Sequence, residues 1–290
     1  MESPADNTPL IVLVGETASG KTALAIQLAK HFNGEIICAD SRTVYKGMDI
    51  GTAKPTFAER DGVPHHLLDV VEPGQPFSVA DFQRLTCQAI QDISARGHVP
   101  FLVGGTGLYI DAILYDFDFR PAPDADERAR LQTMSISELH AEITARGITM
   151  PHNLQNPRHL TRALETNGVT SSNKALRPNT LIMGLSIDRE ALRDKLTRRV
   201  DAMVAAGFVK EVRNLFEKYD PETIALQAPG YKAFREYIEG HCSLDETKAS
   251  FVRNDWQLAK RQRTWFKRNK SIHWIQPEES VAIVTTFLNK

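Results

Sequence analysis

The sequence has few cysteines, no long apolar run and almost no net charge. Its three cysteines, Cys38, Cys87 and Cys242, are widely spaced and include no CxxC pair, which argues against a disulfide framework or a zinc ribbon and fits a reducing cytoplasm. No stretch of about 18 apolar residues occurs, so we expect no membrane span. The polar, acidic start, residues 1–7, lacks the features of a signal peptide.

The charge balance narrows the classes of binding partner. The chain of 290 residues has 35 Lys and Arg against 36 Asp and Glu, a formal net charge of −1. This balance excludes a globally basic nucleic-acid binder but leaves room for a local basic patch. With 42% apolar and 24% charged residues, the composition is that of an ordinary globular protein. The length corresponds to one large domain or two modest ones.

Short apolar runs separated by helical patterns predict an α/β fold with right-handed crossovers. The first run, Leu10–Val14, is continuous and β-branched, as in a parallel strand buried on both faces. A helix is predicted from Lys21 to Phe32, ended by Asn33-Gly34. Further strands are predicted at residues 35–39, 99–103, 181–187 and 272–275.

The pattern changes between residues 116 and 179, where strand-like runs are absent. Short helical patterns there are interrupted by Pro121, Pro123, Pro151, Pro157 and Pro178. We therefore predict a small helical insertion domain, 116–179, within a core domain formed by 1–115 and 180–290.

A phosphate-binding loop follows the first predicted strand. Its eight residues match GxxxxGK[ST]: Gly15, Glu16, Thr17, Ala18, Ser19, Gly20, Lys21 and Thr22. In such a loop, backbone N–H groups surround an anion, the lysine adds a positive charge, and the final hydroxyl can bind Mg²⁺. The motif predicts a polyphosphate ligand without specifying a nucleotide. Because no NKxD sequence occurs, a regulatory GTPase is disfavoured.

Asp40 follows the second predicted strand, at the edge where ligands bind in open α/β sheets. Its carboxylate could hold Mg²⁺ or act as a general base, or it could simply cap the turn that Asp40-Ser41 begins. The sequence leaves both interpretations open.

Three further segments are candidates for the walls of the same site. Residues 45–55 have the small, hydroxyl and aromatic side chains that suit a substrate loop, and Gly104–Tyr109 follows the third strand with three glycines. His65-His66 is a weak candidate for a metal site, because adjacent residues do not share a face; a surface turn is favoured there.

A basic segment lies near the end of the chain. Residues 251–274 contain seven Lys or Arg and one acid, Asp255. Two rows at seven-residue spacing predict a buried stripe: Phe251, Leu258, Trp265 and Val252, Ala259, Phe266. A separate row, Lys260, Arg263 and Lys267, is available to phosphates. A solvated face is the alternative, but the excess of positive charge on a mildly acidic chain favours RNA.

Taken together, these residues resemble the tRNA dimethylallyltransferase (isopentenyl-tRNA transferase) family, from about Leu10 to Trp274. The most specific stretches are Gly15–Thr22, Asp40–Pro55, Gly104–Tyr109, Pro157–Glu165 and Lys260–Phe266. The resemblance implies a P-loop kinase-like parallel sheet with flanking helices, in addition to the helical insertion. It also implies transfer of a dimethylallyl group from dimethylallyl diphosphate to the exocyclic amine of the adenine on the 3′ side of the tRNA anticodon, by a cytoplasmic monomer.

The resemblance also implies roles for individual residues. Asp40 would be the base, Thr17, Ser19, Gly20, Lys21 and Thr22 would hold the diphosphate with Mg²⁺ on Thr22, and Arg199 would contact the diphosphate. Segments that match those contacting the tRNA anticodon stem-loop contain Asp40, Ser41, Arg42, Thr43, Thr106, Arg128, Arg158, His159, Leu160, Thr161, Arg162, Lys260, Arg261, Gln262, Arg263 and Lys267.

Several positions depart from the family pattern. Glu16 stands where Pro is usual, Pro229 replaces an aliphatic residue, and Gln227 and Trp256 occupy positions where Arg occurs. The stretch 167–178 is also shorter than usual. Three alternative functions remain: a small-molecule kinase that uses ATP, an adenylate isopentenyltransferase that acts on a free nucleotide, and a non-catalytic RNA-binding module.

Overall fold

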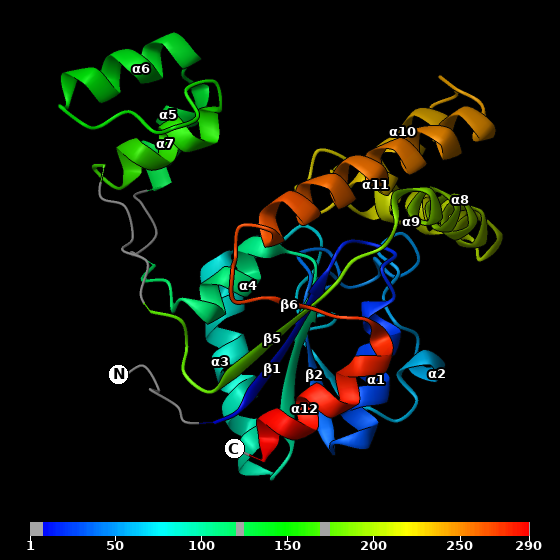
Figure 1. Ribbon diagram of the computed structural model, residues 1–290. Helices are drawn as coiled ribbons and strands as arrows, with labels where there is room; N and C mark the ends of the chain where they lie inside the picture. The colour runs from blue at the N-terminus through cyan, green and yellow to red at the C-terminus, as the bar shows by residue number, and fades with distance from the viewer. Residues whose placement is uncertain (1–7, 120–124, 169–174, 290) are drawn as a thin grey trace. The chain divides into compact units, whose positions relative to one another are not determined.

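The computed structural model describes residues 8–119, 125–168 and 175–289 (Figure 1). Contacts within the chain divide it into two compact units. The first contains residues 1–114 and 176–290, and the second contains residues 115–175. The predicted ranges were 1–115 with 180–290, and 116–179. Pro121, Pro123 and the central part of 167–178 lie outside the described residues.

Within the described residues, the first unit contains one six-stranded sheet in the order β3-β2-β4-β1-β5-β6. All neighbouring strands run parallel, and Ile11 of β1 pairs with Phe101 of β4 and Leu181 of β5. The strands are β1 (Leu10–Gly15), β2 (Gly34–Ala39), β3 (His65–His66), β4 (Val99–Gly104), β5 (Thr180–Leu185) and β6 (His273–Trp274). Every residue of β1 and β2 is buried, as expected for apolar runs covered on both faces. The predicted α/β class is confirmed.

Helices cover both faces of this sheet (Figure 1). α1 and α12 lie on one side, where Leu24, Leu28 and Val284 pack against strand residues such as Ile11; α3 and α4 lie on the other. The bounds are α1 (Lys21–His31), α2 (Phe57–Arg60), α3 (Val79–Ala95), α4 (Gly107–Leu114), a 3₁₀ turn (Pro277–Glu279) and α12 (Ser280–Leu288).

A group of four helices forms a second apolar core in the same unit. Its largest buried side chains are Phe208, Tyr231, Phe234 and Phe251, whose rings meet edge to face or tilted. The helices are α8 (Arg189–Ala205), α9 (Phe208–Lys218), α10 (Pro229–Ile238) and α11 (Leu244–Phe266). This core fixes the position of α11, which carries the predicted basic segment.

The second unit is helical, as predicted for the insertion. It contains α5 (Ala125–Thr133), α6 (Ile136–Ala145) and α7 (Pro157–Glu165). Leu131, Leu139, Ile143, Leu160 and Leu164 form its core. These helices are short, and α6 begins with a capping box in which Ser135 and Glu138 satisfy each other's backbone N–H groups.

Two local predictions differ from the structure. The surface turn predicted at His65-His66 is wrong, because these residues form the edge strand β3, paired with Ile36 and Ile37. The strand predicted at 181–187 is shifted, since β5 covers Thr180–Leu185. Within the described residues, no helix combines the length and apolarity needed to cross a membrane.

Candidate active site

The carboxyl ends of β1, β2 and β4 meet at one edge of the sheet, where the candidate site residues follow each strand. Close backbone approach explains the glycines at this edge. A Cβ atom on Gly104 would lie 2.0 Å from the carbonyl oxygen of Ala39, and one on Gly15 would lie 2.8 Å from that of Leu185. Only glycine fits at such contacts, so the end of β4 lies directly against that of β2, and the end of β1 against that of β5.

The P-loop joins β1 to α1 in the strand–loop–helix context that its motif requires. Gly20 has φ of 90°, a left-handed conformation that favours glycine. The Lys21 ammonium turns back over the loop and donates to the carbonyl oxygen of Glu16 at 3.3 Å. The hydroxyl oxygen of Ser19 is buried and has no hydrogen-bond partner among the described residues. A buried polar atom of this kind, at the N-terminus of a helix, suits an anionic ligand and its metal ion.

Burial lowers the pKa of the Lys21 ammonium from its ordinary value to about 8. The Asp40 carboxylate opposes this shift, and the Arg199 guanidinium adds to it. Asp40 and Arg199 therefore both lie within electrostatic range of Lys21, although the three residues come from three separate elements. A bound diphosphate would supply the negative charge that two neighbouring cations require.

Arg199 of α8 reaches the P-loop, where its terminal nitrogen donates to the hydroxyl oxygen of Thr17. The same nitrogen lies 3.8 Å from a carboxylate oxygen of Asp255 on α11. Asp255 is only 4% exposed, and burial raises its pKa. In the part of the chain that the structure describes, the Nε atom of Arg199 and the Oδ2 atom of Asp255 are buried without hydrogen-bond partners. Asp255 was not predicted as a site residue, although it is the single acid in the basic segment.

Asp40 lies at the end of β2 and is half-buried. One of its oxygens accepts a hydrogen bond of 2.8 Å from the backbone N–H of Arg42, so Asp40 does cap a turn. The neighbouring Ser41 donates its N–H to the hydroxyl of Thr106 at 3.0 Å, which ties the β2 and β4 loops together. Capping and general-base roles are compatible, because the cap uses one oxygen.

Arg42 and Thr43 follow Asp40 in the same loop. The Arg42 guanidinium donates to the carbonyl oxygens of Ile224 and Ala225 at 2.7 and 3.3 Å. Thr43 is buried, and its hydroxyl has no hydrogen-bond partner within residues 8–119, 125–168 and 175–289. Arg42 therefore holds the segment before α10, and its guanidinium is partly occupied.

Residues 262 and 263 of α11 face the P-loop. The Gln262 amide oxygen accepts the backbone N–H of Thr17 at 2.8 Å, and its nitrogen donates to the carbonyl oxygen of Gly105 at 3.1 Å. Arg263 forms a two-point ion pair with Glu16, at 2.6 and 3.1 Å. The prediction that Arg263 shares a phosphate-facing row with Lys260 and Lys267 is therefore corrected, because its guanidinium is occupied by Glu16.

The exposed face of α11 retains Lys260, Arg261 and Lys267. The predicted buried stripe is only partly correct, since Phe251, Ala259 and Phe266 are buried but Trp265 is 37% exposed. The Trp265 indole N–H donates to a carboxylate oxygen of Asp111 at 2.8 Å, which holds the end of the helix against α4.

In the second unit, the residues predicted to contact tRNA lie on different sides of α7. Arg158, His159 and Arg162 are exposed and Thr161 is half-buried, but Leu160 is fully buried in the core of that unit. The Leu160 side chain is therefore part of that core and is not available to RNA. Exposed Arg128 and Arg162 lie 3.5 and 3.4 Å from the Glu165 carboxylate.

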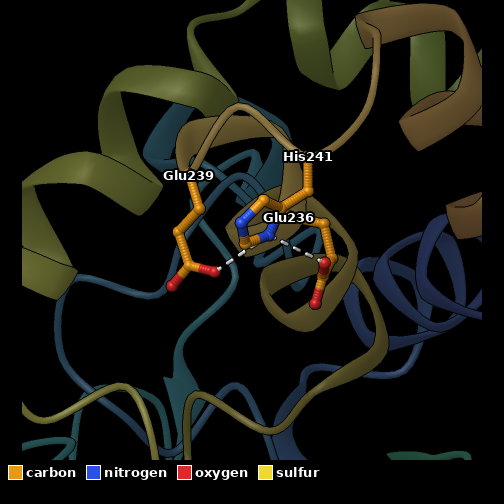
Figure 2. Close-up of side chains that lie close together, drawn as sticks. All are labelled: Glu236, Glu239 and His241. Carbon is orange, nitrogen blue, oxygen red and sulfur yellow. Dashed lines mark hydrogen bonds and ion pairs between the residues drawn. The ribbon is translucent and has the colours of Figure 1, made fainter.

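Figure 2 shows the one group of three or more His, Cys, Asp or Glu, within the described ranges, whose ligand atoms lie close enough for a metal ion. It consists of Glu236, Glu239 and His241, all exposed at the end of α10. The Glu239 carboxylate is already paired with Arg235 at 2.8 Å. This surface group shares no residue with the predicted magnesium site at Thr22.

Comparison with known proteins shows the family to which the chain belongs. The sequence model of the IPP transferase family matches residues 43–269, and that of isopentenyl transferase matches residues 8–72. The chain belongs to the IPP transferase family. The family and the enzyme class predicted from the sequence, a prenyltransferase, are both confirmed.

Relatives in this family are similar over almost their whole length. The tRNA dimethylallyltransferase of Geobacillus kaustophilus (strain HTA426) is 43% identical over 282 residues, covering 91% of this chain and 89% of the relative. That of Bacillus subtilis (strain 168) is 41% identical over 282 residues, with coverages of 92% and 90%.

Solved structures of the family share the fold. The tRNA isopentenylpyrophosphate transferase of Bacillus halodurans superimposes with a TM-score of 0.75 at 38% identity, covering 97% of this chain and 95% of that one. A eukaryotic dimethylallyltransferase, described as acting on tRNA, gives a TM-score of 0.80 at 26% identity, with coverages of 97% and 80%.

Proposed function

We propose that the chain transfers a dimethylallyl group from dimethylallyl diphosphate to the exocyclic amine of the adenine on the 3′ side of a tRNA anticodon. Family membership supports prenyl transfer, and the names of the relatives support tRNA as the acceptor. The observation that carries the proposal is the electrostatic proximity of Lys21, Arg199 and Asp40 at one edge of the sheet. Two cations suit the leaving diphosphate, and one carboxylate suits the attacking amine.

The proposed reaction forms one bond and breaks one. The adenine nitrogen attacks the allylic carbon as the carbon–oxygen bond to diphosphate breaks, and the amine proton passes to Asp40. Negative charge grows on the leaving group, where Lys21, Arg199 and the N-terminal N–H groups of α1 would stabilise it. Asp40 acts as general base because an adenine amine is a weak nucleophile.

A magnesium ion fits the chemistry of the P-loop. The Thr22 hydroxyl would hold it, and the buried, unpartnered hydroxyl oxygen of Ser19 lies inside the same loop. When bound, the ion would neutralise part of the charge on the leaving diphosphate. Lys21 and Arg199 would orient the diphosphate from their own sides of the loop.

The proposal is tested by incubating the protein with Mg²⁺, labelled dimethylallyl diphosphate and unmodified tRNA, with ATP and AMP as competing substrates. Label should appear in tRNA at the adenine beside the anticodon. Label in AMP instead would identify a free-nucleotide transferase, and phosphorylated products from ATP would identify a kinase.

The proposal that tRNA is the acceptor predicts that the exposed cations of α11 contact its phosphates. Replacing Lys260, Arg261 and Lys267 with glutamine should reduce the slope of log tRNA affinity against log salt concentration by about 2–3, because each lost phosphate contact reduces that slope by roughly 0.7–0.9. The measurement is a filter-binding series across salt concentrations.

A single replacement of Lys30 with glutamine serves as the control for the change of charge. Lys30 lies near the C-terminal end of α1, where it is paired with Asp61. Its replacement should therefore leave the slope unchanged. If the triple variant keeps the normal slope, these cations face only solvent and the tRNA assignment of α11 fails.

The lowered pKa of Lys21 predicts a pH dependence of donor capture. Because the pKa is about 8, the free enzyme loses the ammonium as pH rises through that value. The kcat/KM for the donor should therefore fall up to tenfold per pH unit above about 8, since kcat/KM reports the free enzyme. Steady-state rates from pH 6.5 to 9.5, with the donor concentration varied and tRNA held below saturation, would measure this.

Lys21→Arg is the matched variant for that experiment, because a guanidinium stays charged over this range. Its activity should be lower but should no longer decline near pH 8. A decline that persists in Lys21→Arg would assign the titration to another group.

A further inference from the structure

Glu16 is an acid inside a loop that binds anions. Its side chain is buried, with 3% of its surface exposed. A carboxylate in this position would repel a diphosphate and would be costly to bury unless a cation compensates it. That cation is Arg263 of α11, whose Nε and terminal nitrogen donate to the two carboxylate oxygens at 3.1 and 2.6 Å.

The ion pair belongs to a closed ring of hydrogen bonds. The Arg263 guanidinium also donates to the carbonyl oxygen of Ile187 at 2.6 Å, and the Ile187 N–H donates to the Glu16 carboxylate at 3.2 Å. The ring joins the P-loop, the connection between β5 and α8, and helix α11. Because it closes on itself, loss of one member leaves buried polar groups of the others without partners.

The neighbouring residue of α11 supports the same loop from a second point. Gln262 accepts the backbone N–H of Thr17 and donates to Gly105, and the Thr17 hydroxyl in turn accepts from Arg199. Two consecutive residues of α11 therefore fix the backbone at Glu16 and Thr17. The positions of Lys21 and Arg199, the proposed ligands of the diphosphate, depend on that backbone.

We propose that Arg263 is a positioning residue of the donor site, acting through Glu16, and does not contact tRNA. Its charge cancels the acid in the P-loop, and its planar geometry fixes the loop where the diphosphate binds. The inference rests on the proposed function for the identity of the donor. It gives Arg263 a different role from that of the exposed cations on the same helix, which we propose to contact RNA.

The test is a double-mutant cycle with inorganic pyrophosphate and Mg²⁺ as the probe, measured by calorimetry. Arg263→Gln leaves Glu16 uncompensated, so pyrophosphate affinity should fall by at least roughly tenfold. Glu16→Gln alone should leave the affinity within a few-fold. The double variant, Glu16→Gln with Arg263→Gln, should recover part of the affinity that Arg263→Gln lost, because the uncompensated charge is removed while the two-point contact is not restored. A merely structural role for Arg263 would not give this rescue.

Arg261→Gln is the matched control on the same helix. It should leave pyrophosphate affinity unchanged and lower the salt slope of tRNA affinity, whereas Arg263→Gln should do the opposite. If Arg263→Gln does not fold, Arg263→Lys, which keeps the charge without the two-point contact, should weaken pyrophosphate binding to an intermediate degree. The proposal is overturned if the double variant shows no rescue, or if Arg263→Gln changes the tRNA salt slope as Arg261→Gln does.

Pyrophosphate binding does not require prenyl transfer. A failure of this proposal can therefore be distinguished from a failure of the proposed function. If only the proposed function fails, no label enters tRNA, while the Glu16 and Arg263 variants still show the expected pyrophosphate affinities.

Discussion

Replacing Lys21 with alanine is expected to lower prenyl transfer to tRNA by about 10²–10³-fold or more, the loss that follows removal of one preorganised charge-stabilising donor. The ammonium lies over the P-loop, 3.3 Å from the carbonyl oxygen of Glu16, within the electrostatic field of Asp40 and Arg199. Its positive charge stabilises the negative charge that builds on the leaving diphosphate. The measurement is single-turnover transfer of label from dimethylallyl diphosphate at saturating donor and tRNA.

Lys30→Ala is the matched control, since Lys30 lies on the same helix and pairs with Asp61. It should retain near-normal transfer and a normal thermal unfolding midpoint. Near-normal turnover of Lys21→Ala would show that the P-loop does not hold the donor. Efficient ATP hydrolysis by the unmodified protein would instead revive the kinase interpretation.

Replacing Asp40 with asparagine should lower turnover by about 10²–10⁴-fold, the usual cost of losing a general base. The amide oxygen can still accept the N–H of Arg42, as the carboxylate does at 2.8 Å, so the turn should survive. We therefore expect tRNA affinity to change only a few-fold. Single-turnover rates and equilibrium tRNA binding, measured on the same preparation, separate the two quantities.

Asp61→Asn is the control for the loss of a carboxylate, because Asp61 also lies at a turn, with φ of 48°, and it interacts with Lys30. Its turnover should be normal. Equal losses of binding and turnover in Asp40→Asn would leave Asp40 with the role of a turn cap alone.

The sequence predicted the parts of the fold that depend on local pattern. Continuous apolar runs identified β1, β2 and β4, because strands buried on both faces contain few polar residues. The edge strand β3 was missed because two adjacent histidines carry no such pattern. The pairing of His65 with Ile36 depends on neighbouring strands rather than on the histidines themselves.

The candidate site, like the fold, was predicted from the sequence only in part. Spacing identified the P-loop and placed Asp40 at the end of a strand. It could not identify the partner of Arg263. Helical periodicity shows on which face of a helix a residue lies, but it does not show which distant residue meets that face, and Glu16 lies near the other end of the chain. Leu160 was assigned to tRNA by segment matching, although Leu160 and Leu164, four residues apart, already suggest a buried helix face.

The position of β1 in the sheet has a consequence for synthesis of the chain. β1 is made first, yet it lies between β4 and β5, and Ile11 must wait for Phe101 and then Leu181 to complete its pairing. Parallel pairing across such separations is intrinsically slow, because long loops must close before contacts form. The helices at residues 125–165 depend on contacts close in sequence and can form earlier. During translation, one edge of β1 therefore stays unpaired until β5 has been made, and an unpaired strand edge is a site at which nascent chains can associate.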